Sequence, residues 1–551
     1  MKAEITDLIT EACKLKFGQE IIVEINRPEL QFGDFSTNVA MKLAPLIKKS
    51  PFDVAKQLTD HINSSNKFKK VDAIKPGFIN FYLKDNDILK TLDSDISWKK
   101  TNQDKEILIE YGDPNVFKEM HIGHAYSSII GDVISSLLTS SGSIVKRLIY
   151  QGDVGLNIAK GIYGIGEHIN WDLSLLESVT KERSIGYFYA EGEKAFNSDP
   201  AAKEKIKSIN ISVYTKEDSI INKIYDFGKQ MSLDNFDQIF DSIGVVFDKR
   251  YFESQSSIIG KELVESNIGK VFEHSEGAVV YHGEQDGLHT AVFINSQGLP
   301  TYQAKDLGLT ILKYKDYPKF DKSIIVTANE QNDYFRVVFA ALAKIKPDIA
   351  SKTSHISHGF VSLSTGKMSS RTGDVYKASD LIDSIKNAIE KQYPESKVKK
   401  EIFMAAIRYT FIKQRIGVNL VFNPEESVAI EGNSGPYIQY AHARAKNILA
   451  KLPELEKNNE AKKYELEIDE RKLISLMSQF PEVIDAVVND LLPHQICTYL
   501  YQLAQEFNSF YEKNRVVGDK RQSLRVEIVK RYSKILQTGL ELLHIPAPDY
   551  M

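Results

Sequence analysis

The alternation of apolar and polar residues predicts a β-α-β motif over residues 107–150. Residues 107–111 (Ile-Leu-Ile-Glu-Tyr) form a short apolar run that is typical of a buried parallel strand. Apolar residues then recur at helical spacing over residues 122–138, and Gly142 lies where such a helix would end. A second apolar run at residues 144–150 predicts the next strand. This pattern places a Rossmann-type parallel sheet at the centre of the chain.

The same patterning divides the whole chain into three parts. Residues 1–95 predict a small α/β domain, in which the alternating residues 21–25 predict a strand. Residues 105–385 predict the parallel-sheet domain, with a mostly helical, charged insertion at about 160–280. Residues 395–551 carry helix-spaced apolar side chains and predict a helical bundle. We therefore expect an α/β plus all-α fold with three domains.

Composition limits the class of protein. A chain of 551 residues with a formal net charge of −4 is no general polyanion binder, so a nucleic-acid partner would need a local basic surface. Cys13 and Cys497 show neither a disulfide pattern nor metal-ligand spacing, which suits a reducing cytosol and argues against zinc. No apolar run approaches the roughly 20 residues of a membrane span, and the first residues lack a signal-peptide core. We expect a cytoplasmic protein with no membrane segment.

The first candidate site is His121-Ile122-Gly123-His124, at the start of the predicted helix. Helix N-termini present unpaired N–H groups and a partial positive charge, so they attract phosphate. Two histidines three residues apart share a helix face and can both donate to a phosphoryl oxygen. Gly123 removes a side chain where a nucleotide could lie close to the backbone. The alternative is a helix that carries two histidines by chance, because a four-residue match alone is weak.

Two further candidates lie downstream. The loop 366–371 (Gly-Lys-Met-Ser-Ser-Arg) combines a lysine, two hydroxyls and an arginine, which suits the stabilisation of a transition-state phosphate. Alone, it could be any basic surface loop. Tyr302 and Asp306 are four residues apart on a predicted helix, so an aromatic ring and a carboxylate share one face that can bind a cation. The alternative for this pair is an exposed polar helix start.

Together these motifs resemble the class I aminoacyl-tRNA synthetases, whose two signatures match the His121 motif and residues 367–370. Within that class, the sequence is similar to the arginyl-tRNA synthetases. The further stretches similar to this family are residues 32–34, 76–80, 110–115, 302–306, 431–444 and 547–551. The match spans nearly the whole chain. One departure is Gly112-Asp113, which stands where a pair of serines is common.

The resemblance implies ATP-dependent activation of L-arginine and its transfer to the 3′-terminal adenosine of tRNA(Arg), with Mg²⁺ accompanying the ATP. It implies that tRNA must be bound before arginine is activated, and it assigns catalysis to His121, His124 and Lys367. The implied ATP contacts are Asn115, Lys118, His121, Gly123, His124, Lys367, Met368, Ser369 and Ser370. The implied arginine contacts are Glu110, Asn115, Asp153, Tyr302, Asp306 and Gln331.

The resemblance also implies that the N-terminal domain and the helical bundle bind tRNA. The implied tRNA contacts are Phe32, Asn80, Tyr437, Tyr440, Arg444 and Met551. Basic side chains available for phosphates are Arg444, Lys446, Arg515, Lys520, Arg521 and Arg525. A run of charges is more commonly a solvated face, so this role is a hypothesis. No coiled-coil heptad or repeat is visible, and we expect a monomer.

Two other functions fit part of the pattern. A small nucleotidylyltransferase shares the phosphate-binding helix, but it needs neither the Lys367 loop nor a helical domain of this size. A non-catalytic RNA-binding relic of a synthetase would have no chemical need for His121, His124 and Lys367. Pyrophosphate exchange with each amino acid, with and without tRNA, separates these possibilities.

Overall fold

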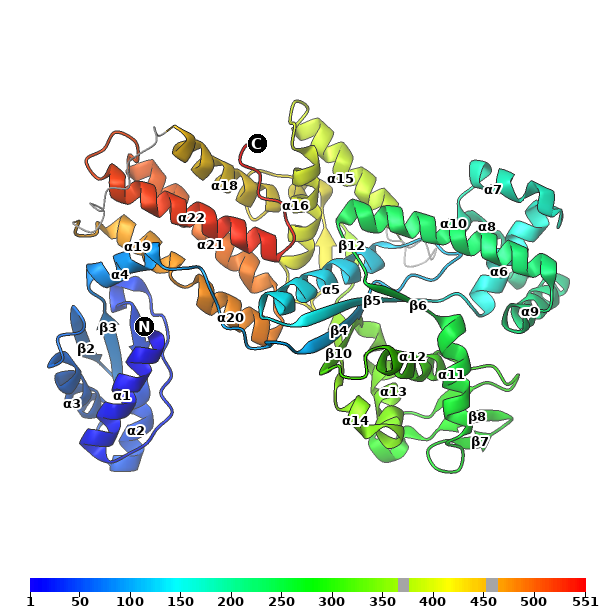
Figure 1. Cartoon of the computed structure of the whole chain (residues 1–551), viewed down its shortest axis with the longest axis horizontal. Helices are drawn as coiled ribbons and strands as arrows, with labels where there is room; N and C mark the ends of the chain where they lie inside the picture. Colours follow the sequence, from blue (N-terminus) through cyan, green and yellow to red (C-terminus); the bar gives the residue numbers. More distant parts are fainter. Residues whose placement is uncertain (365–375, 452–463) are drawn as a thin grey trace. The chain divides into compact units, whose positions relative to one another are not determined.

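The computed structural model describes residues 1–364, 376–451 and 464–551 (Figure 1). The chain forms two compact units, which we describe separately. The first unit joins the N-terminal residues to parts of the helical C-terminal region, namely residues 1–97, 444–482 and 502–535. The second unit holds residues 98–443, 483–501 and 536–551. Among the described residues, every helix is too short or too polar to span a lipid bilayer.

The N-terminal part of the first unit is built on an antiparallel sheet in the order β1-β3-β2. Its strands are β1 (Phe35–Thr37), β2 (Lys70–Ile74) and β3 (Phe78–Tyr82). The neighbouring helices are α1 (Lys2–Phe17), η1 (Leu30–Phe32), α2 (Val39–Ile47), α3 (Pro51–Asn63) and α4 (Asp85–Asp93). The strand predicted at residues 21–25 is wrong, because the only pairing near it is an isolated bridge between Asn26 and Ser36. Burial does alternate here, with Ile25 buried and Ile22 80% exposed, but alternating burial without a pairing partner does not make a strand.

The centre of the second unit is a fully parallel five-stranded sheet in the order β11-β10-β4-β5-β6. Its strands are β4 (Glu106–Tyr111), β5 (Ile144–Gln151), β6 (Lys249–Phe252), β10 (Lys322–Ala328) and β11 (Thr353–His358). Helix α5 (Ile122–Ser140) connects β4 to β5 and packs against both strands (Figure 1). The predicted β-α-β motif is therefore confirmed.

Helix α5 lies close to the sheet because Gly131 has no side chain. A Cβ at Gly131 would come within 2.2 Å of the ring of Tyr111. Another apolar cluster of this unit includes Leu108 of β4, Leu148 of β5 and Leu309 of helix α12 (Tyr302–Asp316). β4 is buried along almost its whole length, as expected for an inner parallel strand, whereas β5 is buried only over its second half.

Other elements extend the second unit. The helices between β5 and β10 are α6 (Leu156–His168), η2 (Leu173–Leu175), α7 (Leu176–Glu182), α8 (Ile185–Ser198), α9 (Pro200–Thr215), α10 (Ser219–Ile243), α11 (Glu253–Glu265), η3 (Gly283–Asp286) and α12 (Tyr302–Asp316). A small antiparallel sheet contains β7 (Glu273–Ser275), β8 (Ala278–Tyr281) and β9 (Ala291–Ile294). After β10 come η4 (Asn329–Gln331), α13 (Asn332–Ile345) and α14 (Pro347–Ala350). The inserted segment is therefore largely helical, with one small sheet.

The remainder of the chain is almost entirely helical. After β11 come β12 (Val361–Leu363), α15 (Ala378–Gln392), α16 (Lys399–Ile412), β13 (Leu420–Phe422) and α17 (Pro424–Ser427). The last helices are α18 (Gly435–Ala450), α19 (Ile468–Met477), α20 (Phe480–Asp490), α21 (His494–Lys513) and α22 (Gln522–Leu542). The predicted combination of a parallel sheet, a small N-terminal α/β part and a helical C-terminal region is confirmed.

Candidate active site

The candidate site lies at the carboxyl edge of the parallel sheet. Strands β4, β5 and β10 are adjacent and parallel, so the residues that follow them meet at one edge. In open α/β sheets, ligands bind at this edge. The segments brought together here are residues 112–115, 152–155 and 329–331. The start of α5 follows the first of these segments and carries His121 and His124.

The two histidines form a stacked, reciprocally capped pair. Their ring centroids are 3.6 Å apart, and the backbone N–H of His121 donates to Nδ1 of His124 at 3.2 Å. Since Nδ1 of His124 accepts, the neutral ring carries its proton on Nε2 and is a donor there. Burial, together with Lys118, lowers the pKa of His121 to about 4. Burial and His121 lower the pKa of His124 well below its usual value. Both rings are therefore neutral near pH 7.

Two N–H groups in the first turn of α5 are engaged within the protein, rather than unpaired as the sequence pattern suggests. Ile122 N–H donates to the carbonyl of Tyr376 at 3.0 Å, and His124 N–H to the carbonyl of His121 at 3.0 Å. Packing within the motif also favours glycine at position 123, because a Cβ there would lie 2.9 Å from Nδ1 of His121. The imidazole N–H groups are thus better placed than the helix end to donate to a phosphate.

The backbone just after residues 365–375 is tied to the start of α5. Ala378 N–H donates to the carbonyl of Met120 at 2.8 Å, and Lys377 forms an ion pair with Glu119 at 3.3 Å. The second signature, with Lys367, Met368, Ser369 and Ser370, lies outside the described residues, so its predicted role stays a prediction. The described residues that follow it, 376–378, nevertheless contact the start of α5, which carries the histidine pair.

Asn115 and Lys118 lie between the histidines and the turn after β5. A Cβ at Gly152 would lie 1.8 Å from Oδ1 of Asn115, so this glycine makes room for the amide. The N–H of Val116 also donates to the carbonyl of Gly152 at 2.9 Å. The Nζ atom of Lys118 lies 4.6 Å from the ring centroid of Tyr189, and burial lowers the pKa of this lysine.

Asp306 is a carboxylate with a neutral partner. The hydroxyl of Tyr334 donates to Oδ2 of Asp306, and among the described residues Asp306 forms no ion pair. Burial raises the pKa of Asp306 to about 7 against the hydrogen bond from Tyr334, which lowers it; the like charges of Glu110 and Glu253 add to the rise. Tyr302, one helical turn earlier, is 53% exposed. Gln331 caps the N-terminus of α13, which carries Tyr334.

Other carboxylates at this edge are already paired with lysines. Glu110 forms a buried ion pair with Lys313, and Glu253 forms one with Lys305. Asp153 is fully buried. Its carboxylate oxygens accept hydrogen bonds from Nζ of Lys229 at 2.6 Å and from the hydroxyl of Tyr225 at 2.8 Å. They also accept the backbone N–H and the hydroxyl of Ser254, both at 2.7 Å. The resemblance predicts that Glu110 and Asp153 contact arginine directly. In the structure, both side chains already bind partners within the protein.

The residues predicted to contact tRNA have different environments. Phe32 is 47% exposed and Tyr440 is 38% exposed. Asn80 is buried, and its Oδ1 accepts the hydroxyl of Ser36 at 2.6 Å across strands β1 and β3. Tyr437 packs 5.6 Å from the ring of Tyr501. The guanidinium of Arg444 donates to Asn508 at 2.9 Å, and Met551 is partly exposed.

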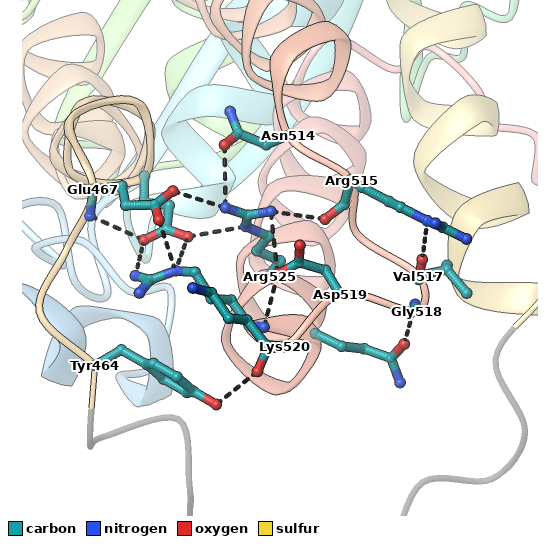
Figure 2. A network of polar contacts seen from close by, with 12 residues as sticks. Tyr464, Glu467, Asn514, Arg515, Val517, Gly518, Asp519, Lys520 and Arg525 are labelled. Carbon is teal, nitrogen blue, oxygen red and sulfur yellow. Dashed lines mark hydrogen bonds and ion pairs between the residues drawn. The ribbon is translucent and has the colours of Figure 1, made fainter.

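Arg521 and Arg525 belong to a buried network of ion pairs in the first unit and do not form a phosphate-binding surface. The fully buried carboxylate of Glu470 accepts Nε of Arg521 at 2.8 Å and Nε of Arg525 at 3.0 Å. Figure 2 shows that Arg525 also binds Glu467, Asn514 and the carbonyl of Arg515. The expectation that these two arginines are available for phosphates is wrong, because their donors already bind carboxylates inside the fold.

Sequence patterns missed the side chains that support this edge. Lys313, Ser254 and Tyr334 each contact a predicted site residue, and Glu253 binds Lys305, the residue before Asp306. None of these four side chains lies in a recognisable motif. A buried acidic residue immediately after the edge strand β6 was the one available signal, and it is weak on its own.

Comparison with known proteins gives a consistent result along the chain. The family model described as "Arginyl tRNA synthetase N terminal domain" matches residues 1–83. The model "tRNA synthetases class I (R), catalytic domain" matches residues 87–422, and "DALR anticodon binding domain" matches residues 438–551.

Curated relatives and solved structures agree with these models. Arginine–tRNA ligase of Flavobacterium psychrophilum is 27% identical over 99% of both chains. That of Treponema denticola is 27% identical over 98% of this chain and 96% of its own. The Thermus thermophilus arginyl-tRNA synthetase structure has a TM-score of 0.79 at 23% identity and covers all of both chains. The Plasmodium falciparum arginyl-tRNA synthetase has a TM-score of 0.78 at 20% identity, covering 100% and 99%.

Proposed function

The chain belongs to the arginine-type class I tRNA synthetase family, and we propose that it activates L-arginine with ATP and charges tRNA(Arg). Its arginyl group would go to the 3′-terminal adenosine of the tRNA. The observation that carries this proposal is the carboxylate of Asp306, which lies at the ligand-binding edge of the sheet and forms no ion pair among the described residues.

Asp306 suits a guanidinium for physical reasons. Three neighbouring acids, Glu110, Asp153 and Glu253, are neutralised by lysines, whereas Asp306 accepts only a neutral phenol within the described structure. A planar guanidinium can donate two parallel hydrogen bonds to one carboxylate. Its charge would also lower the pKa of Asp306 and hold it ionised. The half-exposed ring of Tyr302 offers a flat face for stacking.

The phosphates would lie on the side of the histidine pair. Neutral His121 and His124 can each donate one ring N–H to a phosphoryl oxygen. Asn115 and Lys118 lie near them, and Lys118 supplies a positive charge toward the same side. We propose that Lys367, Met368, Ser369 and Ser370 complete this region, with Lys367 offsetting the charge that builds on the departing phosphates.

The reaction has two balanced steps. A carboxylate oxygen of arginine attacks the α-phosphorus of ATP, a new P–O bond forms, and the bond to the β-phosphate bridge breaks with release of pyrophosphate. The ribose 2′-hydroxyl of the terminal adenosine then attacks the carbonyl carbon of the adenylate, loses its proton and displaces AMP. Among the described residues no cluster of three metal-ligating side chains occurs. A Mg²⁺ ion would thus enter with ATP and take phosphate oxygens as ligands.

We propose that Glu110 and Asp153 act on arginine through the side chains they hold, rather than by direct contact. Glu110 contributes negative charge near Asp306, and Asp153 fixes the turn after β5. Asn115 and Gln331 remain candidates for the amino or carboxylate end of arginine.

For tRNA, exposed Phe32 and Tyr440 are candidates for base stacking, and Tyr437 and Arg444 lie in the same motif as Tyr440. Met551, in the last stretch of the chain, is a further candidate contact. Asn80 would act by supporting its sheet. We also propose a monomeric, cytoplasmic enzyme, which is consistent with two buried free cysteines.

The decisive experiment is ATP–pyrophosphate exchange with each of the 20 amino acids, with and without total tRNA, followed by aminoacylation. We expect exchange with arginine alone, and only when tRNA is present. Exchange with a different amino acid, or no charging of any tRNA with arginine, would contradict the proposal.

A further inference from the structure

The first turn of α11 connects four elements around the proposed arginine pocket. Glu253 binds Lys305 of α12, and Ser254 binds Asp153 in the turn after β5. The side chain of Gln255 accepts the N–H of Phe252 at the end of β6, at 3.1 Å. The hydroxyl of Ser256 lies 2.7 Å from the hydroxyl of Tyr150 on β5. Four consecutive side chains thus link α11 to α12, to the turn after β5, to β6 and to β5.

The contact with α12 is both close and charged. A Cβ at Gly260 would lie 1.9 Å from the carbonyl oxygen of Ala304, and one at Gly308 would lie 2.0 Å from that of Ser256. The two backbones therefore touch where the helices cross. At one end of this crossing, Nζ of Lys305 lies 2.7 Å from Oε2 of Glu253, and both side chains are at least 94% buried.

Lys305 lies where it can determine the positions of the neighbouring pocket residues Tyr302 and Asp306. It lies in the same helical turn as Tyr302 and Asp306, directly before Asp306 in sequence, and its Nζ is 4.9 Å from the ring centroid of Tyr302. Because the ammonium is held by Glu253, it is not available to a phosphate. A buried ion pair is weak evidence for stability, since a neutral pair of similar size can often replace it. Its location therefore points to a role in geometry.

We propose that Glu253 and Lys305 are a positioning pair that holds Tyr302 and Asp306 in register for the guanidinium of arginine. This inference rests on the proposed function. The pair acts through α12 and does not touch the reacting atoms. Loss of the pair would let the first turn of α12 shift, and displacement of a binding group by about 1 Å can cost on the order of 10²-fold in rate.

The test uses the double variant Glu253→Gln/Lys305→Met in the full-length enzyme. This change removes one charge of each sign and leaves no unpaired buried ion. We expect kcat/KM for arginine to fall roughly 10- to 100-fold, mainly through KM. The KM for ATP and the melting temperature should stay near the wild-type values. The single variant Lys305→Arg, which keeps a cation beside Glu253, should keep an arginine KM close to the wild-type value.

A matched control removes a different ion pair of α12, which joins the opposite end of this helix to β6. Lys249 and Asp316 are 2.6 Å apart and partly exposed. We expect Lys249→Gln/Asp316→Asn to leave the arginine KM unchanged. An equal loss in this control would overturn the proposal, because any tether on α12 would then have the same effect.

Two further results would also overturn it. One is a folded double variant whose kcat/KM for arginine stays within about threefold of wild type, well inside the loss expected for a misplaced binding group. If the double variant does not fold, Glu253→Asp carries the test, because it keeps both charges but shortens the carboxylate by one methylene. An unchanged arginine KM in Glu253→Asp would reject the positioning role. Failure of the proposed function is distinguishable, since the wild-type enzyme itself would then not use arginine.

Discussion

Replacement of Asp306 by asparagine tests the arginine pocket directly. The amide keeps the size of the carboxylate and can still accept the hydroxyl of Tyr334, so the local packing should survive. What it loses is the negative charge and the second acceptor oxygen. Hydrogen bonds to charged groups contribute about 1.5–3 kcal/mol each, so two of them amount to about 3–6 kcal/mol. We therefore expect kcat/KM for arginine to fall by roughly 10²- to 10⁴-fold.

The pH dependence of the wild-type enzyme supplies an independent measure of the same group. Burial raises the pKa of Asp306 to about 7 in the free enzyme, and the proposed pocket requires arginine to bind the ionised form. Binding must therefore release a proton below about pH 7, and the arginine KM should rise as the pH falls from 8 to 6. In Asp306→Asn this group no longer titrates, so that part of the pH dependence should disappear.

The stability of the variant separates binding from folding. Since the folded-state pKa of Asp306 is raised, its protonated form is favoured in the fold, and the stabilisation this gives is lost as the pH rises through about 7. Asparagine resembles the protonated form, so Asp306→Asn should melt no lower than wild type at pH 8. The assays are arginine-dependent aminoacylation, ATP affinity and thermal melting. Near-normal use of arginine by a folded Asp306→Asn enzyme would refute the pocket assignment.

Three other substitutions test separate parts of the molecule. We expect His124→Ala to lower the rate of adenylate formation far more than it changes the arginine KM, because its Nε2 donor acts on the transition state; unchanged pyrophosphate exchange would remove it from the phosphate site. Lys367→Ala should slow activation by roughly 10²- to 10³-fold, the usual effect of losing one preorganised donor, as measured by single-turnover adenylate formation. Glu470→Ala should destabilise the fold by about 3–5 kcal/mol in urea unfolding, because it leaves two buried arginines without their shared carboxylate. A midpoint equal to wild type would show that the network of Figure 2 is not needed for stability.

Periodicity predicted the elements that bury a continuous apolar face. β4 and most of α5 are buried, as is the second half of β5, so their sequence pattern reports the fold directly. Residues 21–25 show the limit of this reasoning, because alternation gives a strand only where another strand can pair with it. The pairing there is restricted to one bridge at Asn26, and no local pattern reveals whether a partner strand is present.

The site was predictable to the extent that its residues share one element or one motif. Tyr302 and Asp306 lie in one helical turn, and the two histidines lie at one helix start, as their spacing indicates. Pairings between elements were not predictable. Arg521 and Arg525 have the composition of a phosphate-binding surface, but Glu470 on another helix buries them, and sequence spacing does not report such distant contacts.

Charge pairing explains why one acid among several at this edge is suited to a cationic substrate. A buried carboxylate is costly unless a cation or several donors stabilise it. Lysines meet this need for Glu110 and Glu253, whereas Asp113 accepts the N–H of Tyr150 at 2.8 Å and has its pKa raised by burial and by Glu110. Asp306 keeps a pKa of about 7, so it can be neutral in the free enzyme and ionised when a guanidinium arrives. The fixed lysines therefore do more than stabilise the fold: by pairing with Glu110 and Glu253 they leave Asp306, beside the half-exposed Tyr302, as the acid that we propose gains a cation on binding.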